Sequence, residues 1–389
     1  IIMKKKFCVI TGSRAEYGLF YPLLKEIKED DFFELQIIVT GMHLSPEFGL
    51  TYKEILKDGF AINEKVEMLL SSDTEVSIAK STGLGIIGFS EALNRLKPDA
   101  IAVLGDRFEI FSAVAASVFL KIPVIHIHGG ELTEGAFDDQ LRHAITKMSV
   151  LHFTSCEEYK KRVIQLGEDP ENVFNCGALG VDNIFNIKLL NKKQIEKKIG
   201  LDLTKPTILA TYHPVTLENN TSEKQFRTML KVIDELKNYN IIFTKPNADT
   251  DGRIIIKIID DYVNKNSCRA KSFISLGTLN YLSILRYVKF VIGNSSSGII
   301  EVPYFNIPTV NIGDRQKGRV RPDTVIDCST DYNGIKNAVI KAVSADFIKI
   351  CMRSKKIYGE GNSSEKIASI IKKKLEEGLR LKKQFYDMI

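Results

Sequence analysis

Two kinds of segment alternate along this chain. Short runs rich in Val and Ile recur, and the longer segments between them carry apolar residues at helical spacing. Near-continuous apolar strands separated by amphipathic helices are typical of a parallel sheet that helices cover on both faces. The pattern therefore predicts an α/β protein with doubly wound sheets.

The predicted strands fall into two groups. The first group comprises residues 7–11, 35–40, 61–66, 100–104, 124–128, 150–154 and 173–176. The second group comprises residues 207–211, 240–244, 271–275, 290–292 and 308–312. Helical patterns separate the strands at residues 19–29, 74–96, 110–120, 156–166, 223–237, 253–264 and 279–287. Two doubly wound halves are expected, without a convincing sequence repeat between them.

A chain of 389 residues is too long for one ordinary core. The Lys- and Asn-rich segment 186–205, which Pro206 ends, predicts the crossing between two domains. We expect an N-terminal domain of residues 1–185 and a C-terminal domain of residues 186–362. A Lys-rich amphipathic pattern over residues 363–385 predicts a helix in the C-terminal segment 363–389, which is expected to pack back across the domains.

Composition narrows the function classes. No run of 18 apolar residues occurs, and the N-terminus lacks the apolar region of a signal peptide, so a cytoplasmic protein without a membrane partner is expected. The six cysteines form no CxxC pair and are typical of buried thiols in a reducing cytosol. The net charge of +6 comes with Lys clusters that no aromatic residues interleave, which disfavours nucleic acid as a partner.

Ligands of open parallel sheets bind beyond the carboxyl ends of the strands, and the unusual polar residues of this chain follow its strands. After the first strand, the turn from Thr11 to Gly18 carries glycines, a hydroxyl and Arg14, which suit a phosphate. It is neither GxGxxG nor a Walker loop, so a dinucleotide or ATP gains no support. A tight turn with a solvent-facing arginine is the alternative.

The fourth strand is followed by Asp106 and Arg107. Asp106 occupies a position where catalytic groups of such sheets normally lie, and Arg107 can pair with a phosphate or with the carboxylate. The alternative is that Asp106 caps the next helix.

The fifth predicted strand places His126 and His128 on one face, which would suit a metal. No third ligand has a fixed spacing, so we expect proton-transfer chemistry and no metal. The polar residues that follow are Glu131, Glu134, Asp138, Asp139, Arg142 and His143. Asp138 and Asp139 alternatively charge the first turn of the next helix.

In the second half, an apolar strand leads through Ser295 and Ser296 into a helix that carries Glu301 at its start. Free N–H groups and hydroxyls at a helix N-terminus suit a phosphate, whereas a carboxylate nearby suits the two hydroxyls of a ribose. Together they indicate a nucleotide sugar. A small-residue loop that packs a helix on a sheet is the alternative.

Three further positions follow strands of this half. His213 is expected to face the cleft between the domains, or else to cap the next element. Asn247 can bind a base edge or a phosphate. Arg315 opens a basic loop that can enclose a diphosphate with the two serines, or lie on the surface.

Taken together, the motifs TGSRAEYG, LGDRFE, IHIHGGE with DDQLRHAITK, HP, GNSSSGIIEVP and NIGDRQKGR resemble those of the hydrolysing UDP-N-acetylglucosamine 2-epimerases of bacterial sialic acid synthesis. The resemblance extends from Lys4 to about Arg321 in the family's order. It implies a glycosyltransferase-B-like fold, in which two Rossmann-like domains face a cleft, and no cofactor. It further implies release of UDP and N-acetylmannosamine, and a homo-oligomer, either a dimer or a tetramer.

The resemblance also implies roles for individual residues. The UDP-sugar contacts are Arg14, Gly18, Arg107, His213, Asn247, Ser295, Ser296, Glu301 and Arg315. The catalytic residues are Asp106, Glu131, Asp138 and His213. Some relatives carry an acid where this chain has His128, so Glu131 or Glu134 takes that role, and His128 and Arg142 are further candidates.

We expect elimination of UDP with removal of the C2 proton, followed by addition of water and inversion at C2. The first alternative is a hydrolysing 2-epimerase that acts on a 2,4-diacetamido-6-deoxy UDP-hexose, and another is a non-hydrolysing UDP-N-acetylglucosamine 2-epimerase. A retaining glycosyltransferase would need an acceptor sugar. A UDP-sugar-binding protein would show no turnover.

Overall fold

The computed structural model of the protein describes residues 4–72, 74–134, 137–215, 221–246 and 252–388. The chain divides into two compact units. The first unit comprises Ile1–Glu131, Asp138–Phe185 and Tyr358–Ile389. The second unit comprises Leu132–Phe137 and Asn186–Ile357.

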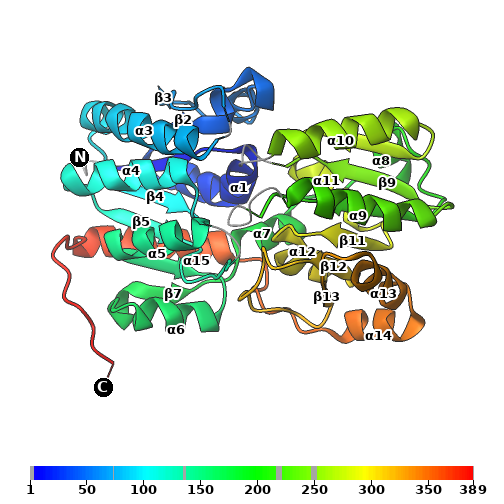
Figure 1. Ribbon diagram of the computed structural model, residues 1–389. Coiled ribbons are helices and arrows are strands. Elements are labelled where there is room, and N and C mark those ends of the chain that lie inside the picture. Colours follow the sequence, from blue (N-terminus) through cyan, green and yellow to red (C-terminus); the bar gives the residue numbers. More distant parts are fainter. Residues whose placement is uncertain (1–3, 73, 135–136, 216–220, 247–251, 389) are drawn as a thin grey trace. The chain divides into compact units, whose positions relative to one another are not determined.

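The first unit contains one parallel sheet with the strand order β3-β2-β1-β4-β5-β6-β7 (Figure 1). Its strands are β1 Lys5–Thr11, β2 Phe33–Thr40, β3 Glu64–Val66, β4 Ala100–Leu104, β5 Val124–Ile127, β6 Leu151–Thr154 and β7 Val173–Asn175. Its helices are α1 Arg14–Glu29, α2 Tyr52–Lys57, α3 Glu75–Leu96, α4 Phe108–Phe119, α5 Asp138–Met148, α6 Glu157–Gln165, α7 Leu179–Asn186 and α15 Ser363–Glu377.

Both faces of this sheet are buried, as near-continuous apolar strands predict. Along β1, Phe7 and Val9 pack in the cluster that includes residues of α1 and α15. Cys8 and Ile10 point to the opposite face and pack in the cluster that includes residues of α3 and α4. Successive side chains of β1 thus point to opposite faces of the sheet and contribute to the hydrophobic core on each face.

Helix α15 packs on α1 and returns the end of the chain to the first unit. Its apolar stripe, Ile367, Ile371 and Leu375, is buried in the core on that side. The helix ends at Glu377, shorter than the helical pattern predicts, and Gly378 follows with φ +86. Left-handed backbone at a glycine ends a helix at little cost, and the residues beyond it run without helical structure.

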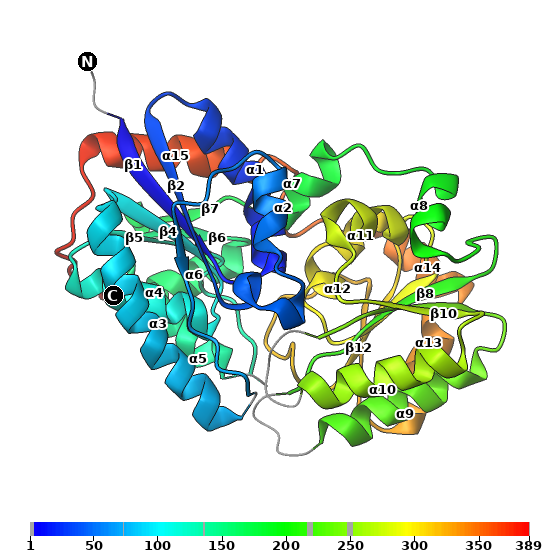
Figure 2. The same ribbon diagram turned by 90° about the horizontal axis from the view of Figure 1, so that it is seen from above.

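The second unit contains a parallel sheet with the strand order β10-β9-β8-β11-β12-β13. Its strands are β8 Thr207–Thr211, β9 Asn240–Thr244, β10 Ala270–Phe273, β11 Phe290–Gly293, β12 Thr309–Ile312 and β13 Val325–Cys328. Its helices are α8 Lys192–Ile199, α9 Ser222–Glu235, α10 Gly252–Lys265, α11 Gly277–Leu285, α12 Ser297–Ile300, α13 Tyr332–Ala342 and α14 Ala345–Arg353. Figure 2 shows α9 and α10 on one side of this sheet and α11 on the other.

Several predictions about elements are corrected. The segment predicted as a crossing contains α8, which starts at the capping box of Asn191 and Gln194. The sequence pattern misses β13, α13 and α14. Cys268 is exposed rather than buried. Within the described residues, every helix is too short or too polar to span a bilayer.

Candidate functional site

Each sheet has one point at which the strand order reverses. In the first unit it lies between β1 and β4, and in the second between β8 and β11. Ligands of doubly wound sheets bind outside the carboxyl ends of the strands at such a point. The loops that follow β4, β8 and β11 carry five of the residues that the sequence singles out: Asp106, Arg107, His213, Ser295 and Ser296.

Asp106 follows β4 and forms an ion pair with Arg142 of α5. The same guanidinium donates to the main-chain carbonyl of Glu131 at 2.8 Å and to Oδ1 of Asp139 at 3.1 Å. The Arg142 side chain is 1% exposed, whereas that of Asp106 is 22% exposed. A buried arginine with three acceptors therefore holds a partly exposed carboxylate at the carboxyl end of β4.

Glu131 is buried beside this pair and accepts a hydrogen bond from Oγ of Ser155 at 2.9 Å. Nδ1 of His128 lies 3.4 Å from Oε1 of Glu131. The prediction that His126 and His128 share a strand face is wrong, because β5 ends at Ile127 and His128 turns the chain with φ +65. The turn carries His128 toward the Glu131 carboxylate instead.

His126 has a supporting role. Its Nδ1 lies 3.1 Å from Oγ1 of Thr146 on α5, and its Nε2 lies 2.8 Å from the carbonyl of Gly105, the residue before Asp106. Burial lowers the pKa of His126 to about 3, so the ring is neutral at ordinary pH. A neutral ring with both nitrogens engaged ties α5 to the end of β4.

Helix α5 begins at Asp138, and both Asp138 and Asp139 lie in its first turn, where negative charge is favourable. The side chain of Asp138 is half-buried. Glu134 belongs to the second unit, where its carboxylate lies 3.5 Å from Nζ of Lys317. Of the two replacement acids that the sequence leaves open, Glu131 is the one in the first unit, where its main-chain carbonyl shares Arg142 with Asp106.

Arg107 serves a neighbouring cluster. It is the N-cap of α4, so the alternative in which Asp106 caps this helix is wrong. Its guanidinium lies 3.2 Å from the carboxylate of Glu109 and 3.9 Å from that of Glu16. Both carboxylates are buried. Arg107 therefore neutralises a buried pair of acids at the end of β1 and β4.

The other predicted residues of the first unit lie on α1. Nε of Arg14 donates to Oε2 of Glu54 at 2.5 Å. The carbonyl of Gly18 accepts from Nδ2 of Asn183 at 2.8 Å. The structure thus gives Arg14 an acidic partner within the unit and gives Gly18 a role in holding α7, apart from the Asp106 cluster.

We expect Glu16→Gln to stabilise the first unit more at pH 8 than at pH 5. Burial, reinforced by the nearby Glu109 carboxylate, raises the pKa of Glu16 from 4.5 to about 7. Folding therefore takes up a proton, and the stability present below pH 4.5 is lost as the pH rises through 7. A shift of this size corresponds to about 3 kcal/mol, which glutamine removes because it stays neutral.

Urea unfolding of both proteins at the two pH values measures this effect. The control is Glu29→Gln, an exposed position on the same helix, for which the difference from wild type is expected to be the same at pH 5 and pH 8. An equal difference for Glu16→Gln at the two pH values would contradict the assignment.

In the second unit, Asn294 links the two central loops. Its Oδ1 accepts from the main-chain N–H of His213 at 2.7 Å, and its Nδ2 donates to the carbonyl of His213 at 2.8 Å. The preceding Gly293 has φ +137, and a Cβ there would lie 1.7 Å from the carbonyl oxygen of Thr211. Only glycine allows β8 and β11 to approach this closely, so the sequence Gly-Asn fixes the position of His213.

The serines follow directly. Ser295 and Ser296 are half-buried before α12, with Ser296 as its N-cap, and Glu301 follows the helix rather than lying within it. Burial raises the pKa of Glu301, and a hydrogen bond with Ser297 opposes this rise. The hydroxyl of Tyr281 on α11 lies 2.5 Å from Oγ of Ser297. The carboxylate is thus held in place by a short chain of hydroxyl groups.

Arg315 follows β12, and its Nη1 donates to the carbonyl of Asn294 at 3.2 Å. Nε2 of Gln316 donates to the same carbonyl at 3.0 Å. The structure therefore brings Arg315 to the loop that carries the serines, which Asn294 links to His213. The predicted contact Asn247 lies outside the described residues.

Several of these partner residues are not among the functional candidates that the sequence predicts. They are Glu16, Glu109, Ser155, Tyr281, Asn294 and Gln316. Asn294 stands inside the quoted motif GNSSSGIIEVP, and Glu16 and Glu109 stand inside TGSRAEYG and LGDRFE. Their position inside these motifs was the available signal.

Comparison with known proteins identifies the family. A sequence profile described as UDP-N-acetylglucosamine 2-epimerase matches residues 25–372. The chain is 48% identical over 344 residues, 88% of this chain and 89% of the other, to the GDP/UDP-N,N'-diacetylbacillosamine 2-epimerase (hydrolyzing) of Campylobacter jejuni subsp. jejuni serotype O:2. It is 40% identical over 388 residues, 99% and 98% of the two chains, to the polysialic acid biosynthesis protein P7 of Escherichia coli.

Two further relatives complete the comparison. The UDP-N,N'-diacetylbacillosamine 2-epimerase (hydrolyzing) of Legionella pneumophila is 36% identical over 370 residues, 95% of this chain and 96% of the other. The crystal structure of UDP-GlcNAc 2-epimerase from Neisseria meningitidis bound to UDP-GlcNAc has a TM-score of 0.80 at 18% identity and covers 95% of this chain and 100% of that one, which shows a common fold. The two sheets therefore form the glycosyltransferase-B-like pair of Rossmann-like domains that the motifs predict, and the chain belongs to the UDP-N-acetylglucosamine 2-epimerase family.

Proposed function

We propose that this protein is a hydrolysing 2-epimerase that converts UDP-N,N'-diacetylbacillosamine, a 2,4-diacetamido-6-deoxy sugar nucleotide, and water into UDP and the free sugar with inverted C2. The geometric observation that carries the reaction is that Arg142 links Asp106, at the carboxyl end of β4, to the main-chain carbonyl of Glu131, which follows β5. The choice of sugar rests on the relatives from Campylobacter jejuni and Legionella pneumophila, whose names specify it. They favour this sugar over the N-acetylglucosamine that the motifs alone lead us to expect.

In the proposed reaction a base removes the proton at C2, the electron pair forms the C1–C2 double bond, and the C1–O bond to UDP breaks. Water then adds its oxygen to C1 and loses a proton to a base, while an acid delivers a proton to C2 from the other face. The reaction needs at least one base and one acid. Asp106, Glu131 and Asp138 supply these groups, and Arg142 keeps Asp106 in position.

The second unit binds the nucleotide in this proposal. Arg315 and the hydroxyls of Ser295 and Ser296 neutralise the diphosphate as it departs. Glu301 accepts hydrogen bonds from the two ribose hydroxyls. His213, which Asn294 holds in position, is a further contact of the nucleotide.

A second candidate substrate is UDP-N-acetylglucosamine. It is favoured by the 40% identity to the Escherichia coli polysialic acid biosynthesis protein P7, which extends over almost the whole length of both chains. The reaction would be the same, and only the groups at C4 and C6 of the sugar would differ.

The test is a parallel incubation of the purified protein with the two sugar nucleotides in deuterated water, followed by NMR and by assay of free UDP. We expect UDP release and deuterium at C2 of the free sugar, with a kcat/KM at least about tenfold higher for the diacetamido substrate. Faster consumption of UDP-N-acetylglucosamine would establish the second candidate. An epimerised sugar still linked to UDP, or no turnover of either compound, would overturn the proposal.

A further inference from the structure

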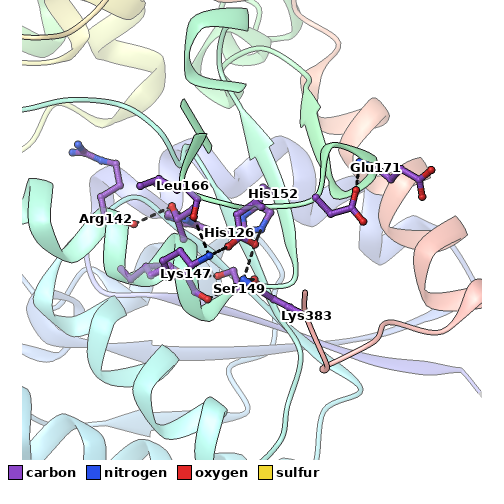
Figure 3. Close-up of polar contacts among 12 residues, drawn as sticks. His126, Arg142, Lys147, Ser149, His152, Leu166, Glu171 and Lys383 are labelled. Carbon is purple, nitrogen blue, oxygen red and sulfur yellow. Dashed lines mark hydrogen bonds and ion pairs between the residues drawn. The ribbon is translucent and has the colours of Figure 1, made fainter. Parts of the chain in front are cut away.

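A buried ionic cluster lies at the opposite end of α5 from the proposed catalytic residues. Its centre is Glu168, a carboxylate only 3% exposed that follows α6. Oε1 of Glu168 accepts from Nζ of Lys147 at 2.7 Å, and Oε2 accepts from Nζ of Lys383 at 2.6 Å. Nε2 of His152 on β6 lies 2.9 Å from Oε2. Figure 3 shows His152, Lys147 and Lys383 gathered in this cluster.

Lys383 belongs to the non-helical tail that follows α15. Besides Glu168, its ammonium group donates to the carbonyls of Lys147 at 2.8 Å and Ser149 at 2.7 Å, at the carboxyl end of α5 (Figure 3). A cation at a helix C-terminus binds the carbonyls that lack partners within the helix and interacts favourably with the helix dipole. The tail therefore provides the C-terminal cap of α5.

The neighbouring tail residues add contacts on the same corner of the unit. The main-chain N–H of Tyr386 donates to the carbonyl of Gly167 at 3.0 Å. Nζ of Lys147 lies 5.0 Å from the ring centre of Phe385. The tail is thus attached through several residues and to a helix distant from it in the sequence.

Along its length, α5 carries residues of the proposed active site, from Asp138 at its start to Thr146 in its last turn. Arg142 holds Asp106, and Thr146 contacts His126, whose ring reaches the carbonyl before Asp106. Arg142, which holds Asp106, lies six residues before Met148, the last residue of α5, or about 9 Å along the helix axis. The hydrogen bonds of Lys383 are with Glu168 and with carbonyls at that end of the helix, not with Asp106. Any effect of Lys383 on the reaction must pass through the position of α5.

We propose that the C-terminal tail is a strap whose Lys383 positions α5, and with it Arg142 and Asp138, for catalysis. This inference rests on the proposed function of those residues. In this role Glu168 pairs with both lysines, and His152, neutral because burial lowers its pKa, donates its Nε2 proton to the carboxylate. Lys383 is a positioning residue and not a catalytic one.

The test compares Lys383→Met, Lys383→Arg and the matched control Lys382→Met in the full-length protein. Lys382 is the exposed neighbour of Lys383 in the tail. We expect Lys383→Met to lower kcat about tenfold with unchanged KM and unchanged UDP affinity, because α5 contributes to chemistry and not to nucleotide binding. Lys383→Arg should restore kcat to within about threefold of wild type, since arginine keeps the cation at the carbonyls. Lys382→Met should match wild type.

Hydrogen exchange provides a second readout that does not depend on activity. In Lys383→Met the amides of 138–148 should exchange at least about tenfold faster, while those of α4 should keep the wild-type rate. Wild-type exchange in α5 together with wild-type kcat would overturn the inference. Faster exchange of the whole first unit would also overturn it, because the tail would then stabilise the fold in general. Lack of turnover in the wild-type protein would refute the proposed function alone, and the exchange of α5 would still decide on the strap.

Discussion

Replacing Asp106 by Asn is expected to lower kcat about 10²–10⁴-fold while changing UDP affinity by no more than about twofold. Asparagine has the same shape and still accepts a hydrogen bond from Arg142, which keeps its contacts with Asp139 and the carbonyl of Glu131. It cannot take a proton from C2. Steady-state kinetics on the sugar nucleotide and calorimetric titration with UDP measure the two quantities separately.

The matched control is Asp139→Asn, which removes the same charge from the same guanidinium. We expect this variant to lose less than about tenfold in kcat, because Asp139 supports Arg142 without a proposed proton transfer of its own. Equal losses in the two variants would show that Asp106 acts only through Arg142. Loss of UDP binding in Asp106→Asn would make Asp106 a ligand-holding residue instead.

The sequence predicts the sheets well because their strands are continuous apolar runs. The ranges 100–104, 207–211 and 240–244 agree with β4, β8 and β9 at both ends. The missed strand β13 lies at the edge of its sheet and carries the exposed Asp327, so it has no such run. Edge strands depend on their neighbour for pairing, and local pattern alone does not identify them.

The candidate site could be predicted only in part. The sequence predicts that Asp106 and Ser295 follow strands, because that requires only the order of elements along the chain. The structure shows that these strands, β4 and β11, stand where the strand order reverses. The partner of a carboxylate, by contrast, depends on the fold, and Glu131 meets Ser155 across 24 residues. The left-handed turn at His128 is also not predictable from the sequence. A non-glycine residue seldom adopts this conformation, and no residue nearby in the sequence indicates it.

The most distant pairing involves the tail. Lys383 and Glu168 are 215 residues apart in the sequence. Each lies in a segment with charged residues, a composition typical of solvent-exposed segments. A helical pattern through residue 385 would have placed Lys383 on α15. Instead, the left-handed backbone of Gly378 ends the helix, and the residues that follow extend to α5.

Asn294→Ala is expected to weaken UDP binding at least about 30-fold and to lower the free energy of unfolding by about 2–4 kcal/mol. The alanine leaves the main-chain N–H and carbonyl of His213 without their side-chain partner in a fully buried position. Each unsatisfied buried group costs about 1–3 kcal/mol. The loop after β8 then loses the contact that fixes His213 beside the serines. The proposed nucleotide site requires His213 in that position.

The control for this variant is Asn311→Ala on the adjacent strand β12. Asn311 is also buried, but its Nδ2 donates at 2.7 Å to Asp327, a half-exposed side chain away from the serines. We expect Asn311→Ala to lower stability and to leave UDP affinity within about twofold of wild type, since Asn294, unlike Asn311, joins the loops after β8 and β11. If the two variants lose UDP affinity equally at matched stability, the effect comes from general loosening of the second unit, and the link between Asn294 and nucleotide binding must be given up.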